Sequence, residues 1–449
     1  MVGAERLLSR LSSVVKRARA DAVSVCAHAQ TRQVFRFAYG AVHQSLRQDG
    51  ITITAGVIRG RRLGVSSTDT LEASSLSRCL HAAGDIARHA PETPYLPELP
   101  AGRRFASRDD VVEATARASA PHCLDLLTRV FRACQGAGVD LAGSFVTGTD
   151  EFCVANSNGL AAYAASTVAG IKLVTMYRAL SGYASGVHRD LSRLDVDALL
   201  RRSMSQSLSR REPVRLPLGT YEVILEPDAV AELLTWLGYT AFGAKSVEER
   251  TSVLAGRMGD RLFSPLLTIT DDATDPQTLR MPFDFEGTPK RRTVLIDRGR
   301  AAGLVYDTTY GRRFGQASTG HGMAPGDTEG PLPLHLDLAA GDTGVAEIIR
   351  SCKRGILIPR FHYVNGLLNP REALMTGLTR EGTCLIEDGA HSHPLRTMRF
   401  THSLLDAFRR VLAVSKERQL VADPAQEAGC VLAPTLRLAA LTFTGHSET

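Results

Sequence analysis

The sequence changes its pattern between residues 211 and 219, and this change constrains the architecture more than any other feature. The segment REPVRLPLG contains two prolines and follows neither helical nor strand periodicity. Helical and alternating runs precede it, whereas from residue 265 onward short apolar runs alternate with turns rich in Gly, Pro and Asp. We therefore expect an α+β protein with an N-terminal α/β layered domain over 1–212 and a C-terminal, β-rich domain over 217–449.

The first half combines helices with strands that alternate apolar and polar residues. Helical periodicity predicts helices at 4–20, 69–90, 109–135 and 190–209. Alternation predicts strands at 22–29, 34–39, 51–58, 139–148 and 151–156.

The second half opens with a predicted strand, Tyr221–Leu225, followed by a central helix over about 228–240. Asp228 is a suitable N-cap for this helix. Four apolar residues share one helical face, namely Val230, Leu233, Leu234 and Leu237. A further helix is expected over 247–260, and mainly antiparallel strands after it. Trp236, the only tryptophan, is expected to pack in the core.

No segment predicts a membrane span or a secretory signal. The best candidate, 159–176, is interrupted by Ser166, Thr167 and Lys172. The first 20 residues carry charges throughout their apolar periodicity, as an amphipathic helix does. We therefore expect a cytoplasmic protein that makes no membrane contact.

The basic net charge does not by itself predict a nucleic-acid partner. The charge is +6, but only six of the 53 basic residues are lysines, and such an Arg-rich composition is typical of GC-rich coding sequences. The densest basic cluster, Lys290 to Arg292, is expected to be a solvated loop. The eight cysteines include no C-x-x-C pair, so most are expected to be small buried residues.

Common hydrolase motifs are missing from the sequence. None of the 13 histidines precedes a glutamate, which excludes H-E-x-x-H and H-E-x-x-x-H, and no G-x-S-x-G occurs. His391, His393 and His402 form one candidate metal cluster, because His391 and His393 share a face of an extended segment. A hydrated turn before Pro394 is the favoured interpretation of these histidines.

A series of short segments occurs in an order typical of one family. The segments are Glu222–Pro227, Thr251–Gly256, Ser264–Asp272, Phe283–Gly287, Ser318–Gly320, Leu336–Leu338, Leu385–Gly389 and Pro434–Leu438. Together they resemble the TldD/PmbA (TldE) family, whose members were labelled modulators of DNA gyrase and are related to zinc metallopeptidases. The resemblance is strong from residue 220 onward and loose in the first half.

Catalytic members of this family carry H-E-x-x-x-H on the central helix. Two histidines bind zinc, and the glutamate activates a metal-bound water. Counting back without gaps from Thr251, the three positions fall on Thr235, Trp236 and Thr240. Threonine is a poor zinc ligand and indole has no basic lone pair, so the resemblance implies a degenerate motif without catalytic residues. The ring of Trp236 is expected to fill the space of the metal and its water.

A cysteine near the C-terminus is a further ligand in the catalytic members. Cys430 lies only four residues before Pro434, which is closer than the family's ligand. The resemblance therefore implies that this chain holds no cofactor and is similar to the TldE (PmbA) side of the family.

The implied function is that of a non-catalytic subunit in a TldD/TldE-type metallopeptidase complex. It would pair as a heterodimer with a zinc-bearing TldD-like homologue, close a proteolytic chamber and bind a peptide or unfolded protein substrate. One alternative is an enzyme of the same fold with remodelled chemistry in peptide or natural-product maturation. Another is a binding or regulatory protein, with nucleic acid as an unlikely ligand.

Two segments that match the family are expected to line a substrate cleft, 318–326 and 361–380. Both are rich in small or turn-forming residues. The candidate lining residues are Ser318, Thr319, Gly320, His321, His362 and Asn365.

Overall fold

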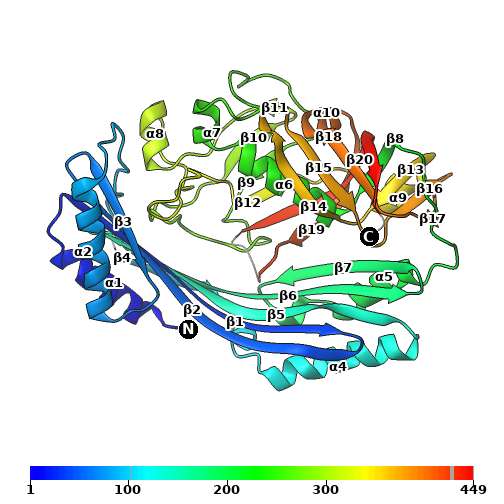
Figure 1. Cartoon of the computed structure of the whole chain (residues 1–449), viewed down its shortest axis with the longest axis horizontal. Coiled ribbons are helices and arrows are strands. Elements are labelled where there is room, and N and C mark those ends of the chain that lie inside the picture. The colour runs from blue at the N-terminus through cyan, green and yellow to red at the C-terminus, as the bar shows by residue number, and fades with distance from the viewer. Residues whose placement is uncertain (103, 425–428, 448–449) are drawn as a thin grey trace.

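The computed structural model describes residues 1–102, 104–424 and 429–447, which form two sheets with helices packed on them (Figure 1). The first sheet spans residues 22–188 and the second spans residues 219–446, so the segment 211–219 lies in the connection between them. The expected α+β class is confirmed. No helix in these three ranges is long and apolar enough to cross a bilayer.

The first sheet has the order β3-β2-β1-β5-β6-β4, with β7 also paired to β6, and only β4 runs parallel to its neighbour. Its strands are β1 Ala22–Ala38, β2 Ala41–Arg59, β3 Arg62–Thr68, β4 Arg104–Asp110, β5 Asp140–Asn156, β6 Ala161–Tyr177 and β7 Leu180–His188. The helices of this half are α1 Ala4–Arg17, α2 Ala73–His89, α3 Glu113–Ala116, α4 Ala120–Gly136 and α5 Val196–Ser207, with a 3-10 turn at Leu191–Arg193.

The two faces of this sheet have different partners. On β1, Val25 belongs to the apolar cluster with α1 and α2, and Phe35 belongs to the cluster with α4 and α5. Because side chains alternate along a strand, the even-numbered residues lie on the other face. There His28 and Arg32 line a cavity together with His335 of the second half. The alternation of β1 therefore assigns one face to the helices and the other to the second half.

Several predicted boundaries in the first half were wrong. The strands expected at 22–29 and 34–39 are one strand, β1, and those at 139–148 and 151–156 are one strand, β5. The polar residues in the middle of these strands stay in register because β1 pairs on both sides, with β2 and with β5. The helix expected over 109–135 is divided into α3 and α4, after the end of β4.

The second sheet has the main order β11-β10-β9-β12-β20-β8-β13-β16-β17, and the β14–β15–β18 and β19 strands attach through β20. Its pairs are mainly antiparallel, with β12–β20 and β8–β13 parallel. The strands are β8 Gly219–Leu225, β9 Ile269–Asp271, β10 Thr293–Asp297, β11 Arg300–Ala301, β12 His335–Leu338, β13 Arg354–Ile358, β14 Phe361–Asn369, β15 Leu374–Thr379, β16 Cys384–Glu387, β17 Ala390–Pro394, β18 Met398–Ser403, β19 Val411–Val421 and β20 Cys430–His446. The helices are α6 Pro227–Ala241, α7 Ala244–Glu248, α8 Thr308–Phe314, α9 Val345–Arg350 and α10 Leu404–Arg409, with a 3-10 turn at Pro370–Glu372.

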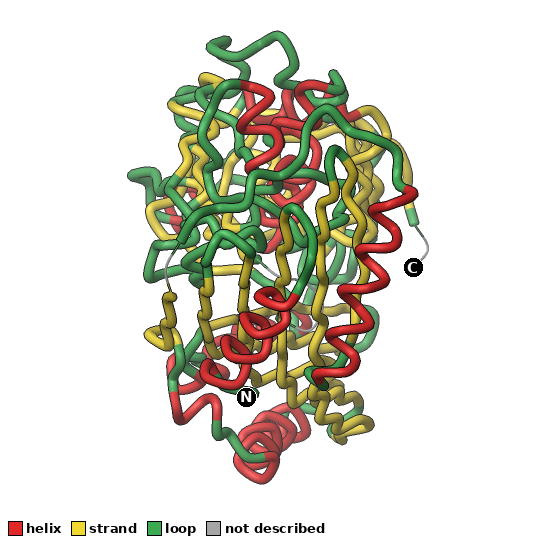
Figure 2. Tube along the Cα trace, turned by 90° about the vertical axis from the view of Figure 1, so that its left-hand side faces the viewer, coloured by secondary structure: helices red, strands yellow, loops and turns green. Residues whose placement is uncertain are grey.

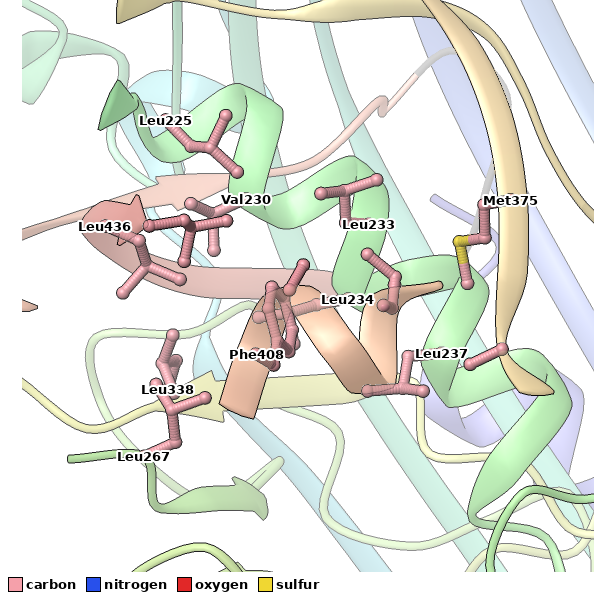
Figure 3. Close-up of a cluster of buried hydrophobic side chains, with 14 of the residues drawn as sticks. Leu225, Val230, Leu233, Leu234, Leu237, Leu267, Leu338, Met375, Phe408 and Leu436 are labelled. Atoms are coloured by element: carbon pink, nitrogen blue, oxygen red, sulfur yellow. The ribbon is translucent and has the colours of Figure 1, made fainter. Parts of the chain in front are cut away.

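Helix α6 is the centre of the second core. Val230, Leu233, Leu234 and Leu237 are each 0% exposed, as the predicted apolar face requires. Figure 3 shows these side chains packed among residues of the surrounding strands and of α10, including Met375, Phe408 and Leu436. Each fully buried side chain of this kind contributes roughly 1.5–3 kcal/mol of hydrophobic free energy, so α6 anchors this half of the molecule.

Two predictions about the region of α6 were wrong. Asp228 is not the N-cap, because the helix begins at Pro227 and its cap residue, Glu226, makes no side-chain cap bond. Asp228 is instead 9% exposed and accepts hydrogen bonds from Tyr183 and Ser185 of β7. The helix expected over 247–260 ends at Glu248, and Arg250 adopts a positive φ of 56°, which breaks helical geometry.

Asp228 therefore joins the two sheets, and its replacement should reduce stability. In Asp228→Ala, the hydroxyls of Tyr183 (3.1 Å) and Ser185 (2.6 Å) lose a buried acceptor. We expect the free energy of unfolding to fall by about 1–3 kcal/mol in urea titrations. Asp125→Ala on the exposed side of α4 is the control and should change it by less than about 0.5 kcal/mol. Equal losses in both variants would contradict the assigned link.

Candidate functional site

The three positions predicted to correspond to the zinc motif differ in their burial on α6. Thr235 is exposed, Trp236 is half-buried and Thr240 is 6% exposed. The hydroxyl of Thr235 donates to the carbonyl of Ala231, and that of Thr240 donates to the carbonyl of Trp236, both at 2.9 Å. Both hydroxyls are therefore engaged by their own helix.

Trp236 fills a gap between α6 and β14. A Cβ atom on Gly366 of β14 would lie 2.8 Å from the indole ring, so the indole fits because residue 366 is glycine. Tyr239, three residues further along α6, meets the indole edge to face, with ring centroids 6.2 Å apart. Trp236 packs against the second core cluster, as expected. That it replaces a metal and its water stays a prediction.

The donor set at these three positions does not fit zinc. Structural and catalytic zinc sites use imidazole, thiolate or carboxylate ligands, whereas α6 offers two internally bonded hydroxyls and an indole. Cys430, the last cysteine, is 5% exposed and its sulfur accepts from the Leu279 N–H at 3.4 Å. Within the residues that the structure describes, no group of three or more His, Cys, Asp or Glu side chains could hold a metal ion.

The predicted loop 318–326 is held by its own side chains. The hydroxyls of Ser318 and Thr319 both donate to the carbonyl of Tyr306 at 3.1 Å. Gly320 has a φ of +78°, and a Cβ there would lie 2.5 Å from the carbonyl oxygen of Pro289, so glycine is required. His321 is 1% exposed, with Nε2 at 2.8 Å from Asp271.

Asp271 is the centre of this buried network. It also accepts the backbone N–H of His335 at 2.7 Å. Burial opposes the charged form, but His321 and Lys290 outweigh burial and lower the pKa of Asp271. Lys290 is only 6% exposed, so the prediction that this basic cluster is a solvated loop was wrong for Lys290. Its charge lies close enough to stabilise the buried carboxylates Asp271 and Asp284.

Two further carboxylates from the family-like segment 283–287 hold neighbouring loops. Asp284 accepts backbone N–H groups of Gly322 (2.7 Å) and Thr288 (2.8 Å). Glu286 accepts the N–H of Thr308 at 2.9 Å and its hydroxyl at 2.8 Å, at the start of α8. Burial raises the pKa of Asp284 to about 6, and burial together with the charge of Asp284 raises the pKa of Glu286 well above its usual range. Both acids therefore position neighbouring loops.

The other predicted lining residues lie on β14, away from the 318–321 loop. The rings of His362 and Tyr363 are tilted by 44° with centroids 4.1 Å apart, and burial lowers the pKa of His362. Asn365 accepts the N–H of Leu367 through its side chain at 2.8 Å. Among the described strands β14 pairs only with β15, so its other edge is free. No hydrogen bond in the described ranges joins these residues to Ser318–His321, and a role of either group in substrate binding stays a prediction.

The three candidate metal histidines have separate partners. His391 Nδ1 lies 3.3 Å from the sulfur of Cys384, and His393 Nδ1 lies 3.4 Å from the carbonyl of Glu212. His402, on β18, contacts Thr442 at 3.1 Å and Asp406 at 3.3 Å. His391 and His393 lie on β17, which does not pair with β18. The structure thus does not bring the three together.

Sequence reasoning missed a polar cavity of about 290 Å³ between the two sheets. His28 bonds Asp150 at 2.9 Å and stacks on Phe152, and Arg32 binds both oxygens of Asp150 at 2.8 Å. His335 lines the same cavity, and burial lowers its pKa to about 4. The alternating polar residues of β1, His28, Gln30 and Arg32, were the available signal.

A larger cavity, of about 760 Å³, lies where α5 meets β16 and β17. Cys384 and His391 line it, and burial raises the pKa of the Cys384 thiol to about 12. The other seven cysteines are buried, which confirms the expectation from the sequence.

Comparison with known proteins identifies the second half. Residues 218–445 match the family described as PmbA/TldA metallopeptidase C-terminal domain. The chain is 27% identical over 232 residues to a metalloprotease TldD homolog of Haemophilus influenzae, a match that covers 50% of this chain and 47% of that protein. The chain thus spans about half the length of the first curated relatives it matches. It is also 23% identical over 422 residues to the metalloprotease PmbA of Escherichia coli O157:H7, covering 89% and 88% of the two chains.

The fold of the whole chain is similar to that of a solved structure. The crystal structure of TldE from Thermococcus kodakarensis superposes with a TM-score of 0.85 at 20% identity, covering 98% of this chain and 99% of that chain. At this identity the likeness establishes the fold alone. The match over residues 218–445 covers half of the sequence, and it confirms the resemblance found in the sequence. This chain belongs to the PmbA/TldD family of metallopeptidase-related proteins.

Proposed function

We propose that this chain is a non-catalytic, TldE-like subunit of a two-chain metallopeptidase in which a TldD-like homologue carries the zinc. The proposal rests on the side chains that α6 presents at the three predicted motif positions. The hydroxyls of Thr235 and Thr240 donate to carbonyls of their own helix, and Trp236 packs on Gly366. A helix with this donor set cannot supply zinc ligands or a general base, so the chain acts through binding.

The substrate of such a subunit would be an extended peptide or an unfolded segment. The free edge of β14 offers backbone groups that can pair with an added strand. Tyr363 is 77% exposed, Leu367 52% and Leu368 49%, so large apolar side chains accompany this edge. Trp236 and Tyr239 lie on the helix that packs beside β14. Backbone pairing would provide affinity without sequence preference, and the apolar side chains would favour unfolded segments.

A second candidate is an enzyme of the same fold with metal-free chemistry, for example in peptide maturation. The contact between Cys384 and His391 favours it, because a thiol 3.3 Å from an imidazole in a large cavity resembles a nucleophile with its base. The raised pKa of Cys384 keeps the thiol protonated, and a protonated thiol is a poor nucleophile. This function is therefore the second candidate. Proteolysis by the isolated, metal-stripped chain that is lost in Cys384→Ser would favour it over the subunit role.

Assembly with a zinc-bearing homologue is the direct test of the proposed function. On co-expression with a homologue that carries H-E-x-x-x-H, we expect one heterodimer in size-exclusion chromatography. Obligate pairs of this kind bury roughly 2,000 Å² or more. A homologue with both motif histidines changed to alanine should still co-elute but have no peptidase activity. Two species that never co-elute would overturn the proposal.

The placement of the motif on α6 can be tested by restoring it. The triple variant Thr235→His, Trp236→Glu and Thr240→His should gain weak zinc affinity, measured by calorimetry, because two imidazoles then project from one helix. Little activity is expected, since the cysteine ligand and the groups that orient the ligands are missing. Trp236→Glu alone is the control and should bind no zinc. A folded triple variant without measurable affinity would contradict the ungapped placement.

A further inference from the structure

The outer face of the first sheet carries a groove between α1 and α2. Both helices pack on this face at one end of the sheet, and Figure 2 shows them on the side that faces the viewer, with a strand visible between them. The groove has a volume of about 550 Å³. Val57 and Arg59 of β2 form part of its floor, and its walls come from both helices.

The charge of the groove is strongly one-sided. Five arginines line it, namely Arg10, Arg17, Arg19, Arg59 and Arg88, against one acid, Asp85. Asp85 is already bonded to Arg88 at 2.5 Å. In the described ranges, the other four arginines have no carboxylate partner. The groove is therefore complementary to a ligand with several negative charges.

Arg59 places an unused donor in the groove. Its Nη2 donates to the carbonyl of Arg19 at 2.8 Å, whereas its Nε is buried and has no hydrogen-bond partner among the described residues. A buried, unpaired donor of a cation is unfavourable and is relieved by an acceptor. The terminal nitrogens of the same guanidinium are the atoms that a carboxylate in the groove would contact.

Gly84 leaves space in the groove that a side chain at this position would fill. It lies inside α2, where glycine destabilises a helix relative to alanine. A Cβ at Gly84 would meet no atom closer than 3.7 Å, the Nη2 of Arg59. By contrast, a Cβ at Gly64 would lie 2.0 Å from the carbonyl of Ala83, so Gly64 is required by the chain's own packing. Among the residues that the structure describes, none packs so closely that Gly84 is required, and the small residue keeps the groove open.

Apolar side chains complete the surface. Val14 of α1 and Leu80 of α2 are half-buried, and both line the groove above the buried Val57. The groove thus has an apolar strip flanked by cations. This surface is complementary to an amphipathic helix with an acidic rim. A flat anionic membrane has no side chains that could enter the groove and pack on Val14, Val57 and Leu80.

We propose that the groove between α1 and α2 is a docking site for an acidic amphipathic helix of a partner protein. Leucine-like side chains of that helix would pack on Val14, Val57 and Leu80, and its carboxylates would pair with Arg59 and the other free arginines. This site lies on the face opposite the second sheet, and the inference does not depend on the proposed function.

The test uses the full chain and a labelled probe peptide of about 18 residues, long enough for five helical turns. The probe has leucines at i, i+3, i+4 and i+7 spacing and glutamates on its flanks; a second probe has lysines in place of the glutamates. In fluorescence anisotropy, we expect micromolar binding of the glutamate probe and at least about tenfold weaker binding of the lysine probe. Added salt should weaken the binding of the glutamate probe.

Four variants separate the effects of charge, shape and fold. Arg59→Gln should weaken binding of the glutamate probe by about tenfold or more, because it removes the cation from the floor. Gly84→Leu should weaken it similarly by filling the groove without a change of charge, whereas Arg298→Gln, at an arginine that is 80% exposed in the second half, should leave it unchanged. Gly84→Ala should keep or raise the melting temperature, which establishes that the position tolerates a side chain.

Three outcomes would overturn the proposal. The first is that neither probe binds at 200 µM, and the second is that both probes bind equally. The third is binding to vesicles that contain phosphatidylserine, sensitive to Arg59→Gln, without binding of the glutamate probe, which would assign the groove to a membrane surface.

Discussion

The burial of helix α6 is the constraint on which the rest of the structure depends. The helix is apolar on most of its circumference and lies inside the second core, so the strands of that half must surround it. Its first turn provides Asp228, which bonds β7 of the first sheet, and Trp236 on its other side packs against Gly366 of β14. This one helix therefore lies at the centre of the second core and also joins the two sheets.

The acidic residues of the family-like segments hold loops in place through hydrogen bonds. Asp271 bonds His321 and the backbone of His335, Asp284 bonds Gly322, and Glu286 bonds Thr308. Through these bonds the loops around 284–288 and 318–322 have one fixed arrangement. These acids therefore serve the fold whatever side chains α6 presents at Thr235, Trp236 and Thr240.

The sequence predicted elements whose signal is local, and it failed where the deciding partner is distant. The apolar face of α6 was predicted because Val230, Leu233, Leu234 and Leu237 follow helical spacing. Asp228 was misinterpreted because a local capping rule cannot anticipate acceptance of hydrogen bonds from Tyr183 and Ser185, more than 40 positions away. Lys290 appeared solvated because its neighbours in sequence are basic, whereas its counter-charges come from Asp271 and Asp284. The groove between α1 and α2 could not be predicted from the sequence, because it depends on where both helices lie on the sheet.

The central claim is that this chain contributes binding and not metal chemistry to its family. The zinc content of the isolated chain, measured by elemental analysis after dialysis, tests this claim most directly. We expect far less than one zinc per chain, because neither Thr235 nor Thr240 offers a ligand. One tightly held zinc per chain, lost in Thr235→Val or Thr240→Val, would contradict it.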